Sequence, residues 1–285
     1  MRVVITGAGG QVGRSLTSLA PSGVEVLGWG HKDLDITDAQ AVNENIRRHA
    51  PAVIINAAAY TAVDRAESEP GLARRINVDG ARHLATAARD VGARFIHIST
   101  DFVFDGAASV PYKPDASTNP LSVYGATKRD AEQAVLGERS VVVRTAWVYA
   151  ADGSNFVRTM LRVMKANGAV RVVADQVGTP TAARSLAEVL WQIVAKPEIN
   201  GIHHWTDAGV ASWYDFAVAI AEEGAELGLV GRDVTVTPIA THEYPTPARR
   251  PTYSVLDKTS LLSQGFAQLH WRKRLRTVLR EIADA

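Results

Sequence analysis

The sequence predicts an α/β fold, in which a doubly wound parallel sheet is joined to a smaller carboxyl-terminal α/β lobe. Three observations support this class. Short β-branched runs alternate with helical patterns through the first half of the chain, as in parallel sheets that helices cover on both faces. The first of these runs leads directly into a glycine-rich turn. After about Tyr149 the alternation loosens into longer helices, short strands and a proline-rich loop.

The individual elements follow from local pattern. Continuous apolar runs predict the strands 3–6, 25–29, 53–56, 95–99 and 141–144. Helix starts are marked by Thr37-Asp-Ala-Gln40, which has the form of a capping box, and by Pro70 in the first turn after Ser68 and Glu69. In the second half, helical periodicity predicts helices at 155–167, 183–195 and 213–226.

Composition excludes several classes of protein. The 285 residues carry a formal charge of +1, so no global field favours nucleic acid or an anionic membrane as a partner. With no cysteine, disulfides and thiolate chemistry are excluded. The apolar run after Met1 is too short for a signal peptide, and no later run is long enough to span a bilayer. We therefore expect a cytoplasmic protein.

Gly7, Gly10 and Gly13 form a G-x-x-G-x-x-G turn between the first predicted strand and a segment that can begin a helix. Glycines let a backbone approach a pyrophosphate at a helix amino terminus, where free N–H groups and the helix dipole favour anions. A tight strand-to-helix turn is the simpler explanation of the same residues. Because strand, turn and helix occur in the required order, we predict a dinucleotide-binding Rossmann domain over 1–150 and a domain mainly for substrate over 151–285, with the chain free to cross back between them.

The residues after the second predicted strand bear on the choice of dinucleotide. Asp33 lies about twenty residues beyond the glycines, where an acid that binds the ribose favours NAD. His31 and Lys32 beside it suit the additional phosphate of NADP. The sequence leaves NADPH and NADH open. The small residues at 56–59 fit either a close approach to a cofactor or a tightly packed strand–helix junction.

Tyr124 and Lys128 stand one helical turn apart, so a lysine cation faces a phenol. A nearby cation lowers the pKa of a tyrosine, which otherwise lies near ~10. By itself the pair also fits an ordinary amphipathic helix. Thr100 and Asp101 follow the strand 95–99 at its carboxyl end, the edge at which open α/β sheets bind ligands. This placement puts hydroxyl and carboxyl groups beside the tyrosine.

Further motifs extend from one end of the chain to the other. They include Asn56-Ala-Ala-Ala-Tyr-Thr-Ala-Val-Asp64, Ser99-Thr-Asp-Phe-Val-Phe104, Arg144-Thr-Ala-Trp-Val-Tyr149, Asp175-Gln-Val-Gly-Thr-Pro-Thr181 and Pro245-Thr-Pro-Ala-Arg-Arg-Pro251. Together with the glycine turn, these motifs resemble the dTDP-4-dehydrorhamnose reductases of the extended short-chain dehydrogenase/reductase superfamily. The resemblance implies reduction of the C4 ketone of a dTDP-sugar by NADPH or NADH, with a nucleotide sugar as the partner.

The resemblance also implies residue roles. Tyr124 would donate the proton, Lys128 would lower its pKa and hold the nicotinamide ribose, and Thr100 would bind the substrate carbonyl. Asp101 and Trp147 would contact the sugar. The residues expected to line the dinucleotide, besides Gly7, Gly13, Tyr124 and Lys128, are Gly10, Gln11, Val12, Asp35, Ile36, Ala59, Tyr60 and Thr61.

Arg249 and Arg250 lie in the proline-rich loop, and guanidinium groups match phosphate oxygens well. Surface charge is the simpler explanation, but the resemblance favours binding of the substrate diphosphate by at least one of them. Phe102 after Asp101 argues against a related dehydratase, in which an acid and a base stand side by side.

Two positions depart from members of the family that dimerise around magnesium. Ser15 and Arg184 stand where those members carry glutamates, and neither suits a hard dication. We expect no metal and a monomer or a weak homodimer. Two other functions stay open. The chain could be a regulatory subunit that keeps the dinucleotide fold and binds another enzyme, or a reductase of a different nucleotide keto-sugar.

Overall fold

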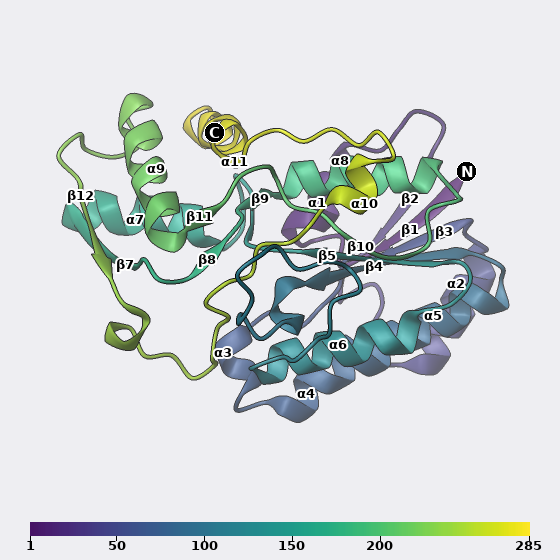
Figure 1. The fold of residues 1–285 in the computed structure, drawn as a ribbon. Helices are drawn as coiled ribbons and strands as arrows, with labels where there is room; N and C mark the ends of the chain where they lie inside the picture. The colour runs from purple at the N-terminus through teal and green to yellow at the C-terminus, as the bar shows by residue number, and fades with distance from the viewer.

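The structure is a computed structural model that describes residues 1–285. Its centre is a six-stranded sheet in the order β10-β5-β4-β3-β1-β2, and every strand pair in it is parallel (Figure 1). The strands are β1 (Arg2–Thr6), β2 (Glu25–Trp29), β3 (Val53–Asn56), β4 (Arg94–Thr100), β5 (Ser140–Thr145) and β10 (Gly201–His204). The predicted α/β class with a doubly wound parallel sheet is confirmed.

Helices cover both faces of this sheet. On one face lie α1 (Gln11–Ser18) and α8 (Ala183–Ala195), and on the other α2 (Ala39–His49), α5 (Ala81–Asp90) and α6 (Val123–Val135) (Figure 1). Alternate residues of each strand therefore enter two separate cores, which explains why the strand sequences are apolar throughout. The strand order reverses between β1 and β3, the point at which open α/β sheets leave a crevice for ligands.

Short elements connect the sheet to its surroundings. After β3 come α3 (Val63–Ala66), α4 (Pro70–Arg74) and a π-helical turn η1 (Arg75–Gly80), and after β4 comes the 3₁₀ turn η2 (Asp101–Val103). Pro70 occupies the first turn of α4, as its sequence predicts.

The smaller part of the molecule has a core of its own, centred on Phe216. Its longer elements are α7 (Phe156–Asn167), β7 (Ala169–Val173), α9 (Trp213–Glu226), β12 (Thr235–Ile239) and α11 (Trp271–Ala283). The shorter ones are β6 (Val148–Tyr149), β8 (Val177–Gly178), β9 (Thr181–Ala182), β11 (Ala211–Ser212), η3 (Thr241–Glu243) and α10 (Thr259–Leu262).

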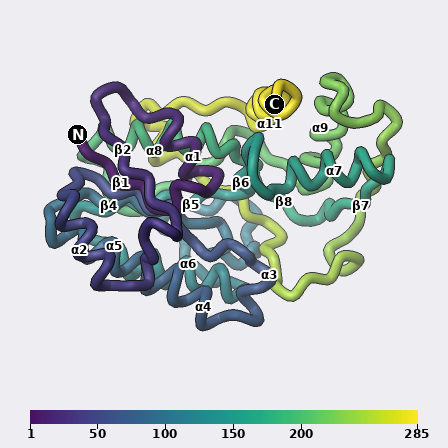
Figure 2. Tube along the Cα trace, turned by 180° about the vertical axis from the view of Figure 1, so that it is seen from behind, coloured from purple at the N-terminus to yellow at the C-terminus, as the bar shows by residue number.

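The chain crosses between the two parts more than once. After α7 and β7 in the smaller part, α8 returns to cover the sheet, and β10 then forms the edge of the sheet beside β5. Seen from behind in Figure 2, the late segment that leads from β12 also passes close to α3. The division into a dinucleotide domain over 1–150 and a mainly substrate domain over 151–285 stays a prediction, and in space the second part of the chain contributes to both lobes.

The structure corrects the predicted first residues of two helices, α2 and α7. Thr37 does not cap α2, because its hydroxyl and its N–H both donate to Asp35 Oδ1. Asp38 caps the helix instead and accepts a hydrogen bond from the N–H of Ala41 at 3.0 Å. Asn155 is the cap of α7 rather than its first residue. In both cases an Asp or Asn side chain competes effectively for the free N–H groups of the first turn.

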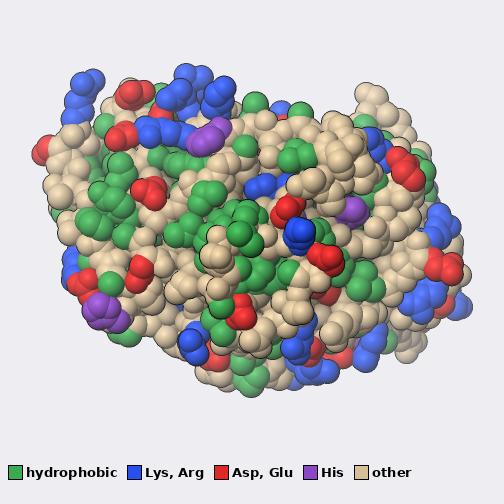
Figure 3. Space-filling model, in the orientation of Figure 1, with side chains coloured by type: hydrophobic (Ala, Val, Ile, Leu, Met, Phe, Trp, Pro, Cys, Tyr) green, Lys and Arg blue, Asp and Glu red, His purple; other side chains and the backbone are tan.

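None of the helices combines the length and the apolar character that a bilayer crossing requires. On the face drawn in Figure 3, positive and negative side chains are interspersed with hydrophobic ones.

Candidate active site

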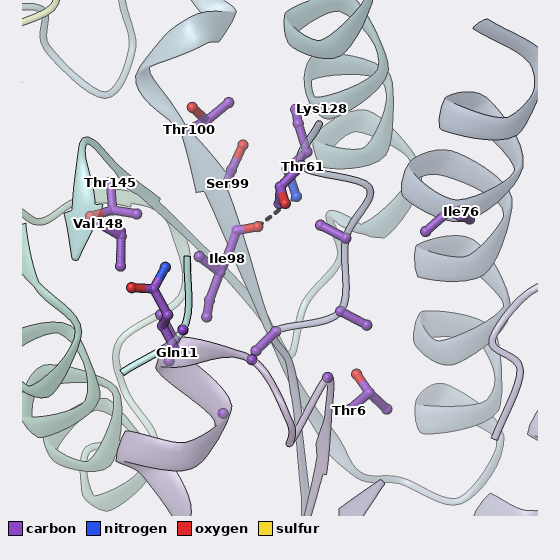
Figure 4. Close-up of a pocket in the computed structure, with 18 of the residues that line it drawn as sticks. Thr6, Gln11, Thr61, Ile76, Ile98, Ser99, Thr100, Lys128, Thr145 and Val148 are labelled. Carbon is purple, nitrogen blue, oxygen red and sulfur yellow. Dashed lines mark hydrogen bonds between the residues drawn. The ribbon is translucent and has the colours of Figure 1, made fainter. Parts of the chain in front are cut away.

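A cavity of about 980 Å³ opens at the carboxyl ends of β1, β3, β4 and β5. Its lining residues come from the glycine turn, from the loops after the strands, from α6 and from the smaller lobe; some of them are drawn in Figure 4. Of the residues singled out in the sequence, the cavity is lined by Gly7, Gly10, Gln11, Val12, Gly13, Asp35, Ile36, Ala59, Thr61, Thr100, Asp101, Tyr124, Lys128, Trp147 and Arg250. Tyr60 and Arg249 are not among its lining residues.

The glycine turn is held by close backbone contacts. Gly7 has φ of 71°, and a Cβ on it would stand 2.6 Å from the carbonyl carbon of Ala57. A Cβ on Gly13 would stand 2.2 Å from the oxygen of Gly7. No side chain larger than hydrogen fits at either position. Gly10 precedes α1 without any side-chain cap, so the first N–H groups of this helix face the cavity free to bind an anion.

The segment after β2 presents one histidine and one acid to the cavity. His31 and Asp35 line it, whereas Lys32 and Asp33 do not. Asp33 turns back and accepts a hydrogen bond from the N–H of Gly30 at 2.8 Å. Asp35 is engaged by Thr37, and these hydrogen bonds hold its pKa below the ordinary range. Asp33, which has the spacing of a ribose-binding acid, is thus engaged within its own loop, whereas Asp35 lines the cavity.

Tyr124 reaches the cavity because α6 begins close against η2. Ser122 caps the helix, and its hydroxyl accepts a hydrogen bond from the N–H of Gly125 at 3.2 Å. A Cβ on Gly125 would lie 2.2 Å from the carbonyl oxygen of Phe102, so glycine allows the two backbones to touch. Phe102 in turn packs edge-on against the ring of Tyr124, with 5.6 Å between ring centroids. These contacts place the phenol beside Thr100.

Burial is the largest influence on the pKa of the tyrosine. Burial raises the pKa of Tyr124 to about 12, a hydrogen bond with Thr100 lowers it, and the Asp101 carboxylate raises it further. The ammonium of Lys128 donates to the carbonyl oxygen of Ile98 at 2.7 Å (Figure 4). Burial lowers the pKa of Lys128 itself to about 8, against the opposing effect of Glu132. The site therefore favours an uncharged phenol over a phenolate.

Thr100 and Asp101 form a second polar pair. The Thr100 hydroxyl donates to Asp101 Oδ1 at 3.0 Å and accepts from the N–H of Phe102 at 3.2 Å. Burial raises the pKa of Asp101 to about 6, although hydrogen bonds from Ser254 and Thr100 lower it. In this arrangement the single proton of Thr100 points to the carboxylate and not into the cavity.

Two stacked indoles form one wall of the cavity. Trp147 has φ of 50°, and its ring stacks on that of Trp213 with 3.6 Å between centroids and 8° between planes. Trp213 opens α9, behind a capping box made by Ser212 and Asp215. Sequence reasoning located this helix but missed Trp213 as a lining residue. The available signal was a large aromatic in the first turn of a helix in the substrate lobe.

The two arginines of the proline-rich loop separate in the structure. Arg250 lines the cavity and pairs with Asp64 of α3, at 2.8 Å from Nη2 to Oδ2 and 3.1 Å from Nη1 to Oδ1. Arg249 is exposed and lies off the cavity. A diphosphate that binds Arg250 must therefore compete with Asp64.

Tyr60, which does not line the cavity, donates its hydroxyl proton to Glu69 at 2.6 Å.

Comparison with known proteins identifies the family. The family model described as the RmlD substrate binding domain matches residues 1–283. A dTDP-4-dehydrorhamnose reductase from Aggregatibacter actinomycetemcomitans is 42% identical over 97% of this chain and 98% of its own. The chain belongs to the dTDP-4-dehydrorhamnose reductase family. The resemblance inferred from the motifs is thus confirmed.

Solved structures of this family have the same fold. The dTDP-4-dehydrorhamnose reductase of Clostridium acetobutylicum superposes with a TM-score of 0.93 at 44% identity, covering 99% of each chain. That of Bacillus anthracis, solved in complex with NADP, gives a TM-score of 0.92 at 37% identity, covering 98% of this chain and 99% of its own.

The positions that bear on metal binding lie apart from any acidic cluster. The hydroxyl of Ser15 donates to the carbonyl oxygen of Gln11, and Arg184 pairs with Glu188 one turn later on α8. No group of three or more His, Cys, Asp or Glu side chains is arranged to hold a metal ion.

Proposed function

We propose that this chain reduces the C4 ketone of dTDP-4-dehydro-β-L-rhamnose with NADPH or NADH and so forms dTDP-L-rhamnose, the last step of dTDP-rhamnose biosynthesis. One observation carries the proposal. The phenol of Tyr124 and the hydroxyl of Thr100 share a single cavity with the glycine turn, at the edge of the sheet where a dinucleotide can reach them. The names of its close relatives support the same reaction.

The first end of the cavity fits a dinucleotide. The glycine turn presents uncapped N–H groups of α1 to a pyrophosphate, and no side chain intrudes at Gly7 or Gly13. When bound, the reduced nicotinamide supplies the hydride for the carbonyl carbon. Lys128 would hold the nicotinamide ribose. The residues after β2 favour NADPH, because His31 faces the cavity and Asp33 is turned away from it.

Tyr124 supplies the proton in this mechanism. Because its pKa of about 12 keeps the phenol protonated at neutral pH, it can donate to the alkoxide oxygen that forms at C4. Thr100 would hold the same oxygen once the substrate carbonyl replaces Asp101 as the acceptor of its proton. Tyr124, together with Thr100 once its proton turns from Asp101 to the substrate oxygen, would stabilise the negative charge that develops there.

The second end of the cavity would bind the sugar nucleotide. Asp101 and Trp147 line it next to Tyr124, and the stacked face of Trp213 extends the wall. Arg250 would bind the diphosphate by exchanging its partner Asp64 for phosphate oxygens. The exposed Arg249 takes no part in this proposal.

The test follows the absorbance of NADPH and of NADH with the protein and enzymatically generated dTDP-4-dehydro-β-L-rhamnose, beside a Tyr124→Phe control. We expect oxidation, faster with NADPH, that the substitution abolishes. No turnover by a folded protein that still binds NADPH would overturn the reductase and favour the regulatory subunit. Turnover of another dTDP-keto-sugar in preference would overturn only the choice of substrate.

We further propose a cytoplasmic monomer or weak homodimer that needs no magnesium. Ser15 and Arg184, which offer no carboxylate to a dication, support this assembly. Light scattering after size exclusion, with and without magnesium, tests it, and a magnesium-dependent dimer would contradict it. Fractionation of cells that express the chain tests the location.

A further inference from the structure

A turn of the smaller lobe lies beside the glycine turn and contributes to the wall of the cavity. This cross-lobe turn, residues 150–155, connects β6 to α7, and Figure 2 shows α7 beginning close to α1. Gly153 and Ser154 of the turn line the cavity, as do Gln11 and Arg14 of α1. The proposed reaction gives the cross-lobe turn and Arg14 no role.

Arg14 and Asp152 form a bidentate ion pair between the lobes. Nε of Arg14 donates to Oδ2 of Asp152 at 2.6 Å, and Nη2 donates to Oδ1 at 3.0 Å. The other end of the guanidinium, Nη1, donates to the carbonyl oxygen of Gly9 in the glycine turn. Beside this pair, Nδ2 of Asn155 donates to Oε1 of Gln11 at 2.9 Å. The cross-lobe turn is thus bound to the beginning of α1 and, through Arg14, to the glycine turn itself.

The shape of the cross-lobe turn is fixed within the smaller lobe. Oδ1 of Asn155 caps α7 and accepts a hydrogen bond from the N–H of Arg158 at 3.1 Å. Nη1 of Arg158 donates to the carbonyl oxygen of Ala151 at 2.6 Å. An exposed ion pair contributes to stability when its geometry is bidentate and little side-chain entropy is lost in forming it. Asp152 meets both conditions, because an ordered segment presents it to Arg14.

The pairing also determines what charge this part of the cavity presents to a cofactor. Arg14 directs Nε and Nη2, an edge with which a guanidinium can bind a phosphate, at the Asp152 carboxylate. A carboxylate without this partner would repel a pyrophosphate, whereas the pair carries no net charge. The geometry thus favours a connection between the lobes over a phosphate ligand.

We propose that the Arg14–Asp152 pair retains the bound dinucleotide: it joins the lobes beside the glycine turn, and the cofactor leaves only after the pair has broken. The inference rests on the proposed function for the place of the cofactor, with its pyrophosphate at the amino end of α1. The closed turn packs tightly against this helix, since a Cβ on Gly153 would stand 3.1 Å from Nη2 of Arg14. Arg14 and Asp152 are positioning residues and take no part in the chemistry.

Removal of the carboxylate distinguishes this role from a simple effect of charge. Asp152→Asn takes a negative charge away from the anion site, so electrostatics alone predicts tighter binding and slower release of the cofactor. Loss of the connection between the lobes predicts faster release. The two explanations therefore differ in sign.

The test measures the release of NADPH in the absence of any sugar. The complex with NADPH is mixed with excess NADP⁺ in a stopped-flow instrument, and the loss of NADPH fluorescence gives the dissociation rate. We expect Asp152→Asn to release NADPH roughly two- to fivefold faster than the unaltered protein, the range that the strength of an exposed ion pair implies. An unchanged or slower rate would overturn the proposal.

The matched control is Glu25→Gln. Arg2 and Glu25 form an ion pair at 3.1 Å, with side-chain exposures of 38% and 57%. The corresponding exposures in the Arg14–Asp152 pair are 42% and 57%. The control pair lies at the amino ends of β1 and β2, whereas the cavity opens at the carboxyl ends of the strands. We expect Glu25→Gln to release NADPH at the unaltered rate, and an equal acceleration in both variants would contradict the role of the inter-lobe pair.

A second comparison separates the two members of the pair. If Arg14 acts only through Asp152, then Arg14→Gln added to Asp152→Asn causes no further change in the release rate. A further acceleration would assign Arg14 to the cofactor phosphates and contradict the proposal.

The release rates do not depend on turnover. A protein that binds NADPH but reduces no keto-sugar would contradict the proposed function and leave this inference intact. A protein that binds no NADPH would contradict both.

Discussion

The two ends of the cavity differ in what holds their shape. At the dinucleotide end, backbone touches backbone: a Cβ on Gly13 would stand 2.2 Å from the oxygen of Gly7. At the sugar end, side chains from distant segments meet, as Trp147 stacks on Trp213 and Arg250 pairs with Asp64. The first end is encoded within one short stretch of sequence, whereas the second exists only after the chain has folded.

This difference has a functional consequence. Backbone N–H groups recognise a pyrophosphate in the same way whatever the neighbouring side chains are. The sugar end depends on the pKa values and hydrogen bonds of a few buried groups, so single substitutions there should change chemistry while the fold and the cofactor end are preserved. Substitutions at the two ends of the cavity should therefore differ in whether they change chemistry or stability.

Tyr124→Phe should lower kcat by roughly 10²- to 10⁴-fold, because the alkoxide loses its proton donor. The ring remains packed against Phe102, so NADPH affinity should change little. Single-turnover kinetics and fluorescence titration with NADPH measure the two effects separately. A comparable loss of NADPH affinity would show that the two ends of the cavity are not independent.

Asp101→Asn should change how stability depends on pH. The native pKa of Asp101 is raised from 3.8 to about 6, so the folded state holds this proton more tightly than the unfolded chain does. Its contribution to stability is greatest below the unfolded pKa and is lost as pH rises to about 6; a shift of this size corresponds to at most about 3 kcal/mol. Urea unfolding near pH ~4 and ~7 measures the free energy of unfolding of both proteins. Relative to the wild type, the variant should be more stable at the higher pH than at the lower one. Parallel pH profiles of the two proteins would argue against a raised pKa.

Gly13→Ala should destabilise the protein by roughly 1–3 kcal/mol, because the new methyl group meets backbone atoms that have no room to move. Gly9→Ala is the matched control, since a Cβ there has no neighbour within 4 Å. Its free energy of unfolding should stay within about 0.5 kcal/mol of the wild type. Equal losses in the two variants would show that the turn is sensitive to any added side chain rather than to backbone contact.

Trp213→Ala should raise KM for the sugar nucleotide by roughly twofold to tenfold, because a stacked aromatic pair contributes about 0.5–1.5 kcal/mol beyond its buried area. KM for NADPH should stay unchanged. Trp213→Phe keeps an aromatic face against Trp147 and should recover most of the affinity. An effect of Trp213→Ala on kcat alone would mean that the indole positions the reacting groups instead of binding the sugar.

The sequence predicts well whatever depends on neighbours along the chain. The strands 25–29 and 53–56 and the helices 183–195 and 213–226 match β2, β3, α8 and α9 at both ends. Apolar runs and helical periodicity contain the information for these elements. The glycine turn falls in the same class, because strand, turn and helix are contiguous.

What sequence reasoning missed depends on contacts between distant segments. Nothing near Arg250 indicates that Asp64 will bind it. Nothing near Lys128 indicates that its amine will contact the carbonyl oxygen of Ile98 and the ring of His97. Such contacts arise when the loops after separate strands meet at one edge of the sheet, which is also where the chemistry is.

In the proposed reaction, a hydride reaches C4 of a dTDP-keto-sugar in this cavity. The most direct test supplies NADPH with deuterium in the transferred position and examines the sugar product by NMR. The proposed function predicts dTDP-L-rhamnose with deuterium at C4, and no product from Tyr124→Phe. Deuterium at another carbon, or a product without deuterium, would contradict it.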